Sequence, residues 1–185
     1  MAETFLHNID VDKLKSVFES TKENVTYFED TCREVVRQYS DSLDNLMSDL
    51  YVECVQQPDP PTSLLERYYL ELSNMVYFMI DRLEQLGVYA DMAKSASKEV
   101  YSKTYLAHQV KENSTGKNKT TVAELQAQSE IASQYESIVS SIYDHAYKVV
   151  KGKVSAAQDM MNTLRKILSV KTSEMELSRM QQRSS

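Results

Sequence analysis

The sequence predicts an all-α protein, an elongated antiparallel bundle of three long helices with coiled-coil-like heptad packing. Apolar residues recur every three or four positions over long stretches, which is the period of an amphipathic helix. The 185 residues include only three Gly and three Pro, which leaves few turn-forming residues for a multi-stranded sheet. Apolar residues make up 42% of the chain and charged residues 26%, a composition typical of a folded protein.

The first predicted helix spans roughly residues 10–56, a stretch without Gly or Pro. Asp10 or Asp12 can cap its start. The Pro-rich turn at 58–62 ends it, because proline removes backbone donors. Its apolar residues form two interleaved series that step by seven, the second slipping by one residue before Leu43. The series are Phe18, Val25, Cys32, Tyr39 and Leu46, and Thr21, Phe28, Val35, Leu43 and Leu50. Such a heptad seam predicts packing against other helices.

The second predicted helix begins at Ser63, which forms a capping-box pattern with Glu66. Its seam steps by seven through Leu65, Leu72, Met79, Leu86, Ala93, Val100 and Ala107, with Tyr69, Val76, Leu83, Ala90, Ser97 and Thr104 at the other seam position. Gly87 inside this run costs about 1 kcal/mol against Ala and allows a local bend. Seam residues are large up to Leu86 and small afterwards. Small residues let helix axes approach closely, so we expect a tight antiparallel hairpin with the next helix.

The third predicted helix follows a polar, basic loop at residues 111–120 that contains Gly116. Thr121 and Glu124 form a second capping-box pattern, and the helix continues to about Val170 with Gly152 inside it. One seam is Ile131, Tyr135, Ile138, Ile142, Ala146 and Val149, and the adjacent one is Val139, Tyr143, Tyr147, Val150, Val154 and Met161. A helix with two seams contacts two neighbours. These neighbours are the other two helices, or one of them and another protomer.

The chain therefore divides into an acidic N-terminal long helix (1–57), a Pro-rich turn (58–62), a helical hairpin with a basic loop (63–171) and a flexible tail (172–185). Helices of this length are about 70 Å long. A lone rod of three such helices exposes much surface per residue, so we expect a homo-oligomer.

Charge is divided unevenly along the chain. Residues 1–91 carry seven basic and eighteen acidic side chains, whereas residues 92–171 carry twelve basic and seven acidic ones. An acidic half followed by a basic half indicates charged partners. Alternatively, the two halves fold back on each other and neutralise their charges.

The sequence lacks the patterns of a membrane span and of a secretory signal. No segment approaches the roughly 20 uncharged apolar residues of a membrane span, and the first ten residues lack the pattern of a secretory signal. Cys32 and Cys54 lie on one predicted helix, roughly 33 Å apart, which is too far for a disulfide. We expect two reduced, buried cysteines and a cytoplasmic protein, in the host cytoplasm if it is viral.

Enzymatic function is not expected. The three histidines are far apart and belong to no metal-binding spacing, the Glu-x-x-His pairs of a di-iron bundle are missing, and no nucleotide-binding glycine motif occurs. We therefore predict no catalytic residues, no metal site and no cofactor.

A candidate nucleic-acid site lies near the end of the second helix. Lys94, Lys98, Tyr101, Tyr105 and His108 recur at steps of four and three, which places them on one helix face. Lysines interleaved with aromatics suit single-stranded nucleic acid, because ammonium groups neutralise phosphates and rings stack on bases. The predicted site also takes in nearby basic residues: Lys103, Lys111, Lys117 and Lys119. The alternative is that these lysines only solvate the helix while the two tyrosines pack on helix one.

The stretch from Tyr69 to Phe78, the helix that continues to Tyr105, the basic loop and the helix from Thr121 to Ile167 resemble the UvsY-type recombination mediators of tailed bacteriophages. The similarity covers roughly residues 65–170. It consists of the Tyr-and-Asn-containing opening, a long helix rich in Ala, Lys and Tyr, and a return helix with a Tyr/Ile/Leu stripe. The acidic helix of residues 1–57 is an addition to the short family members.

The resemblance implies a ring-forming, non-enzymatic helical protein that binds single-stranded DNA, contacts the phage single-strand-binding protein and loads a RecA-like recombinase. It implies DNA contacts from basic residues near the hairpin: Lys94, Lys98, Lys103, Lys111, Lys117 and Lys119. The alternative function is a helical structural, assembly or adaptor protein, such as a virion component or scaffold. Such a protein binds partner helices through its stripes and does not bind nucleic acid.

Overall fold

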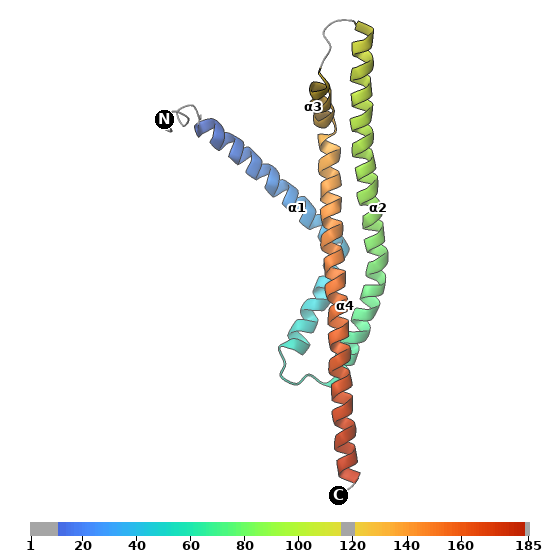
Figure 1. Cartoon of the computed structure of the whole chain (residues 1–185). Coiled ribbons are helices and arrows are strands. Elements are labelled where there is room, and N and C mark those ends of the chain that lie inside the picture. The colour runs from blue at the N-terminus through green and yellow to red at the C-terminus, as the bar shows by residue number, and fades with distance from the viewer. Residues whose placement is uncertain (1–10, 116–120, 184–185) are drawn as a thin grey trace, which may run out of the picture.

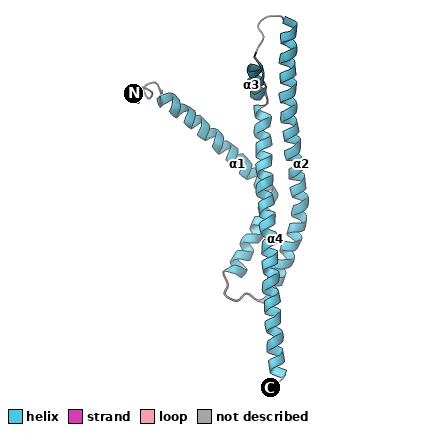
Figure 2. Ribbon diagram, in the orientation of Figure 1, coloured by secondary structure: helices cyan, strands magenta, loops and turns pink. Residues whose placement is uncertain are grey.

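The protein is all-α. The computed structural model describes residues 11–115 and 121–183, with side chains from residues 25–110 and 121–183. Its elements are α1 (Val11–Leu50), the π-helix η1 (Tyr51–Val55), α2 (Thr62–Thr115), α3 (Val122–Ala132) and α4 (Gln134–Arg183), and the described residues contain no strand (Figure 2). No helix in this described part is long and apolar enough to cross a bilayer.

The two longest helices, α2 and α4, run side by side in opposite directions (Figure 1). α3 lies against the last part of α2, and α1 contacts both α4 and α2. α1 follows this pair only over its C-terminal part, and its N-terminal part diverges from it (Figure 1). The helices are therefore not side by side over their whole lengths.

The first helix widens before it ends. In η1 the amide of Gln56 donates to the carbonyl oxygen of Tyr51 at 3.1 Å, five residues back, and Cys54 is buried. The proline turn separates this helix from α2. At the start of α2 the amides of Leu64 and Leu65 donate to the Pro61 carbonyl at 3.0 and 3.2 Å. The predicted end of helix one and start of helix two agree with these boundaries to within one or two residues.

α2 is longer than predicted. It continues to Thr115, so the first five residues of the predicted loop at 111–120 are helical, while residues 116–120 lie outside the described residues. The structure also explains the glycine inside this helix. A Cβ atom on Gly87 would lie 3.3 Å from Cε2 of Tyr147 on α4. The missing side chain therefore lets the tyrosine ring pack directly against the α2 backbone.

The third predicted helix is divided into α3 and α4 at Ser133. Its capping box is present, because the Glu124 amide donates to the Thr121 hydroxyl at 3.3 Å and Glu124 Oε2 accepts from the Thr121 amide at 2.8 Å. Farther along, the buried hydroxyls of Ser129 and Ser133 donate to the carbonyls of Leu125 and Ser129 at 2.8 and 2.9 Å. Such back-bonding to the preceding turn favours bending, but Ser40 and Thr163 make the same contact within unbroken helices. The break is not visible in the hydrophobic pattern.

α4 is also longer than predicted. The flexible tail predicted for residues 172–185 is helical as far as Arg183, and all of its side chains to that residue are exposed. No Gly or Pro follows Gly152, so nothing in the sequence stops the helix.

The hydrophobic core lies where α1, α2 and α4 meet. From α2, the predicted seam residues Leu65, Leu72, Met79 and Leu86 are all buried, as predicted. They are joined in one cluster by residues of α1, η1 and α4: Val36, Leu43, Leu50, Cys54, Ala146, Val150, Val154, Ala157 and Leu164. Burying a side chain of this kind contributes about 1.5–3 kcal/mol.

Several predicted seam positions outside this core are exposed in the described structure. Ile131 is 71% exposed, Tyr135 74%, Val25 50% and Ile138 42%, and Ala107 is also exposed, so these residues do not belong to the core of this chain. The reason is the course of α1. Because its N-terminal part diverges from the α2–α4 pair, no third helix of this chain covers the hairpin near Ile131 and Tyr135 (Figure 1).

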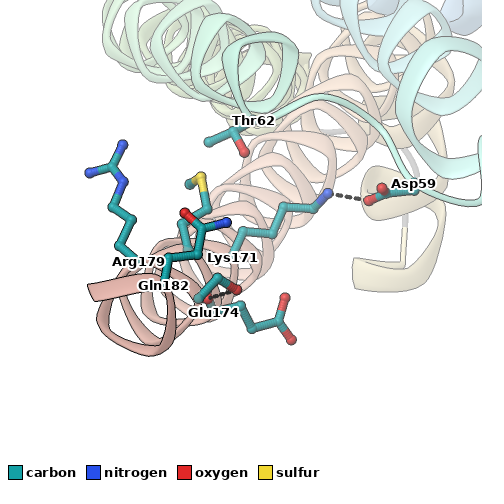
Figure 3. A pocket seen from close by; sticks show the side chains of 8 residues that line it. Asp59, Thr62, Lys171, Glu174, Arg179 and Gln182 are labelled. Atoms are coloured by element: carbon teal, nitrogen blue, oxygen red, sulfur yellow. Dashed lines mark hydrogen bonds and ion pairs between the residues drawn. The ribbon is translucent and has the colours of Figure 1, made fainter. Parts of the chain in front are cut away.

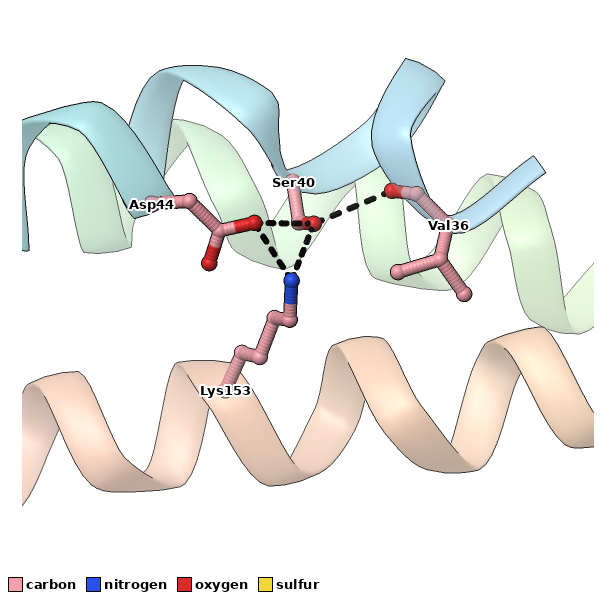
Figure 4. A network of polar contacts seen from close by, with 4 residues as sticks. All are labelled: Val36, Ser40, Asp44 and Lys153. Carbon is pink, nitrogen blue, oxygen red and sulfur yellow. Dashed lines mark hydrogen bonds and ion pairs between the residues drawn. The ribbon is translucent and has the colours of Figure 1, made fainter. Parts of the chain in front are cut away.

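Polar contacts fix α1 and the proline turn onto α4. Lys153 on α4 donates to the buried Ser40 hydroxyl at 3.0 Å and to the Asp44 carboxylate of α1 (Figure 4). About three turns before the end of α4, Lys171 donates to the Pro60 carbonyl at 2.9 Å and pairs with Asp59 (Figure 3). Both lysines therefore bind the acidic first part of the chain to the basic second part.

Candidate nucleic-acid interface

The candidate interface lies on the last five turns of α2 whose side chains are described. Lys94 and Lys98 are exposed, while Tyr101, Tyr105 and His108 are half-buried. The helical period places these five residues on one face of α2, at the edge of the side that packs against the return helix. Four of the eight predicted site residues, Lys94, Lys98, Tyr101 and Tyr105, thus share this face with His108.

The rings of Tyr101 and Tyr105 stack on each other on this face. Their ring centroids lie 6.4 Å apart and the ring planes differ by only 13°. Neither ring is fully buried, so each keeps part of an aromatic surface open to solvent. Parallel, partly open rings one helical turn apart are suited to stack on unpaired bases, a contact worth about 1–3 kcal/mol per base.

Charges around the face are partly compensated. Lys94 lies close enough to α4 to help lower the pKa of Asp144, although the main cause of that shift is the hydrogen bond from Lys148. Lys98 takes part in none of the ion pairs of the described residues. The face therefore offers phosphate groups two ammonium groups that form no ion pair among the described residues, one of them near the Asp144 carboxylate.

Lys103 does not lie on this face. It follows Lys98 by five residues, which turns it about 140° around the helix, and it pairs with Glu99, whose pKa it lowers. Exposed pairs of this kind hold little free energy, so the lysine remains available to another anion. The side chain of Lys111, and Lys117 and Lys119 altogether, lie outside the described residues.

No group of three or more His, Cys, Asp or Glu residues among the described side chains is arranged to hold a metal ion. Cys32 and Cys54 are buried and form no disulfide, and burial raises the pKa of both thiols. A raised thiol pKa lowers the fraction of nucleophilic thiolate at neutral pH.

Two hollows were not anticipated from the sequence. One, of about 550 Å³, opens where α1 diverges from α4 and is lined mainly by Val25, Phe28, Cys32, Val36 and Val149. The other, of about 410 Å³, lies beside the proline turn, where Lys171 and Arg179 line it together with Asp59 and Glu174 (Figure 3). In the second hollow Lys171 is already bound to Asp59 and Pro60, so its charge is not free for a ligand.

A further surface missed from the sequence is the outer side of α2, where several large apolar residues are exposed. The residues with more than half of their surface exposed on this side are Leu70, Tyr77, Val88, Met92, Leu106 and Val110. In the sequence these residues recur at steps of 7, 11, 4, 14 and 4, which places them on one side of a helix but does not form an unbroken heptad series. Comparison of the chain with protein-family models, with curated proteins and with solved structures gave no match.

Proposed function

We propose that this chain is a non-enzymatic accessory protein of phage recombination that self-associates, binds single-stranded DNA and helps to load a RecA-like recombinase. The observation that carries the proposal is the face of α2 on which exposed Lys94 and Lys98 adjoin the parallel rings of Tyr101 and Tyr105. The resemblance to UvsY-type mediators over residues 65–170 supports the same function.

The face has the two components that non-specific single-strand binding needs. Ammonium groups supply attraction to the phosphate backbone, and this attraction weakens as salt rises because binding releases counterions. Aromatic rings stack on any base, so they add affinity without reading sequence. The proposal therefore includes no preferred DNA sequence.

Part of the acidic charge lies away from this face. Residues 1–91 carry eleven more acidic than basic side chains. α1 accounts for four of these, with nine acidic and five basic residues, and it diverges from the hairpin toward its N-terminus (Figure 1). Repulsion between this helix and DNA bound at Lys98 is weakened by distance, because exposed charges are screened over about 8–10 Å at physiological salt.

Two finer features belong to the same proposal. The buried residues Leu65, Leu72, Met79 and Leu86 step by seven, so we assign coiled-coil-like heptad packing to the three-helix core. The two free cysteines fit the reducing cytoplasm in which such a protein acts.

The test is a fluorescence-anisotropy titration of a labelled single-stranded oligonucleotide at about 50 mM salt, where phosphate contacts are strong. We expect Lys94→Ala with Lys98→Ala to weaken binding, and Tyr101→Ala to weaken it further. The matched control is Arg165→Ala with Lys166→Ala, which removes two exposed positive charges from the far part of α4. Equal weakening by the control pair, or no binding by the wild type, overturns the proposal.

A second function, that of a helical assembly or adaptor protein, is favoured by one specific observation. The outer side of α2 exposes six large apolar side chains in the described structure, and such surfaces bind partner helices. This function requires protein association without affinity for nucleic acid, so the same titration separates the two.

A further inference from the structure

Two exposed apolar faces, one on α1 and one on α4, are separated where α1 diverges (Figure 1). Val25 of α1 is 50% exposed, and Tyr135 and Ile138 of α4 are 74% and 42% exposed. At about 100° per residue, Val25 lies within about 20° of Val36 on the same helix. Ile138 lies within about 20° of Val149 in the same way. Each exposed face therefore continues, toward the N-terminus of its helix, the side on which the two helices meet.

The register of the two helices is fixed where they still pack together. Val36 belongs to the apolar core, Val149 packs against that core, and both line one hollow. Four residues farther along each helix, Lys153 donates to the Ser40 hydroxyl at 3.0 Å. In both pairs the α4 residue number exceeds the α1 residue number by 113. The helices therefore run in the same direction at this contact, as Figure 1 also shows.

The same register matches the two exposed faces to each other. Val25 and Ile138 also differ by 113 residue numbers. Each of them lies eleven residues, or about 16 Å, before the place where Val36 adjoins Val149. If α1 followed α4 over this length, Val25 would lie against Ile138 without any change in the existing contacts.

The hollow between the two helices is the space that such a course would fill. Its volume is about 550 Å³, and its lining is mainly apolar, with Val25, Phe28 and Cys32 from α1 and Val149 from α4. Apolar surface around an open hollow stays in contact with water, and burying it contributes about 25 cal/mol per Å². Closure of the hollow would therefore stabilise the chain.

The charges beside these faces are compatible with contact. On α4, Glu136 and Asp144 lie about 140° around the helix from the centre of its apolar face. On α1, Glu29 lies on the matching side, where it lines the hollow together with the basic residue Lys153 of α4. Arg33, which also lines the hollow, already pairs with a carboxylate of its own helix. No carboxylate of one face therefore meets a carboxylate of the other.

We infer that the N-terminal part of α1 is a strap that closes onto the exposed face of α4 in the same chain, with the contact of Lys153 as its fixed point. This contact continues an interface that the two helices already form, and it keeps the register of that interface. It covers Val25 and Ile138, whereas Ile131 lies on α3 beyond the break and is not part of it. The inference goes beyond the proposed function and does not rest on it.

A disulfide tests the register of closure. With both native cysteines replaced by alanine, we expect Val25→Cys and Ile138→Cys to form a disulfide within one chain under air oxidation, because a disulfide needs Cα atoms within about 7 Å. The matched control is Tyr27→Cys with Ile138→Cys, since Tyr27 is 72% exposed and points to the opposite side of α1. No disulfide, a disulfide only between two chains, or an equal yield in the control overturns the inference.

A disulfide can trap a rare arrangement, so the equilibrium distance is measured separately. Spin labels at Tyr27→Cys and Ser137→Cys, both at exposed sites, report the separation of the two helices by pulsed electron paramagnetic resonance. Packed helix axes lie about 8–10 Å apart, so we expect a short-distance component that Ile138→Glu removes. The matched control is Ile80→Glu on α2, since Ile80 and Ile138 are both 42% exposed. A distribution without the short component, or one that responds equally to both changes, contradicts closure.

These tests do not depend on the DNA-binding proposal. Both are made without nucleic acid, and none of the substitutions lies on the face of α2 that contains Tyr101 and Tyr105. A protein that closes yet fails to bind an oligonucleotide supports the strap and counts against DNA binding. A protein that binds the oligonucleotide but does not close gives the reverse result.

Discussion

The ammonium group of Lys153 on α4 binds two groups of α1 at once, the Ser40 hydroxyl at 3.0 Å and the Asp44 carboxylate, and Ser40 also donates to the Val36 carbonyl at 3.0 Å (Figure 4). Ser40 is fully buried and the two charged side chains are about one-third and two-fifths exposed. A polar contact within an apolar seam restricts the register of the two helices, because any other alignment leaves a charge unpaired. Lys153 also lines the hollow that opens where α1 diverges from α4.

Loss of Lys153 should loosen α1. We expect Lys153→Ala to lower the free energy of unfolding by about 1 kcal/mol, a value reduced from that of a fully buried charged hydrogen bond because both partners are partly exposed. Urea denaturation followed by circular dichroism measures it. Lys166→Ala, at an exposed site on the same helix, should leave stability unchanged. Equal effects of the two changes would show that the network does not hold α1.

The two helical glycines should respond differently to alanine. Nothing lies within 4 Å of a Cβ atom on Gly152, whereas one on Gly87 meets the Tyr147 ring at 3.3 Å. We expect Gly152→Ala to raise the free energy of unfolding by about 0.5–1 kcal/mol, and Gly87→Ala to give less than this or a loss. Thermal unfolding of the two variants makes the comparison. An equal gain at both sites would contradict the close contact between Tyr147 and α2.

Alanine substitution should lower the free energy of unfolding more at a buried seam position than at an exposed one. Leu72 is fully buried, so Leu72→Ala should lower the free energy of unfolding by about 2–5 kcal/mol. Ile131 is 71% exposed, so Ile131→Ala should change it by less than about 0.5 kcal/mol. Urea denaturation of both variants gives the two values. A large loss for Ile131→Ala would mean that a further helix covers the upper part of the hairpin in solution.

Stability should fall in alkaline solution. Burial raises the pKa of the Cys32 thiol and of the Tyr68 phenol, and burial followed by the nearby Tyr89 and Tyr143 raises the pKa of Tyr39. The folded protein therefore keeps these protons at pH values where the unfolded chain loses them. The stabilisation is complete below the ordinary values, about 8.5 for a thiol and about 10 for a phenol, and is lost as pH rises through the raised values.

The measurement is the free energy of unfolding from urea denaturation at pH 8 and pH 10.5. We expect a lower value at pH 10.5, and a smaller fall in Tyr68→Phe, which has no proton to lose at that position. A free energy that is constant or increases over this range would contradict the raised pKa values.

Much of the fold could be predicted from the sequence, because the governing signals are local. The buried series from Leu65 to Leu86 follows from spacing alone, and the capping box at Thr121 and Glu124 follows from residue type. The break at Ser133 could not be predicted, because the apolar spacing continues across it and no Gly or Pro lies there. The divergence of the N-terminal part of α1 from the α2–α4 pair could not be predicted either. The seam residues in that part are as apolar as those that remain packed.

The candidate site was predictable in part for a related reason. Helical spacing places Lys94, Lys98, Tyr101 and Tyr105 on one face; α2 is helical over this stretch and the rings of Tyr101 and Tyr105 stack. Lys103 was grouped with these residues because it is close to them in sequence. It lies five residues after Lys98, however, and therefore on another side of the helix. The exposed apolar residues on the outer side of α2 were missed because a single strong seam was taken to explain the apolar residues of this helix.

The central claim, binding of single-stranded DNA through α2, is tested most directly by the salt dependence of oligonucleotide affinity. The logarithm of the association constant should fall linearly with the logarithm of salt concentration. Lys94→Ala with Lys98→Ala should reduce the magnitude of that slope by about 1.4, which is two phosphate contacts at about 0.7 each. An affinity that does not change with salt, no binding at about 50 mM salt, or a slope unaltered by the two substitutions would contradict the account.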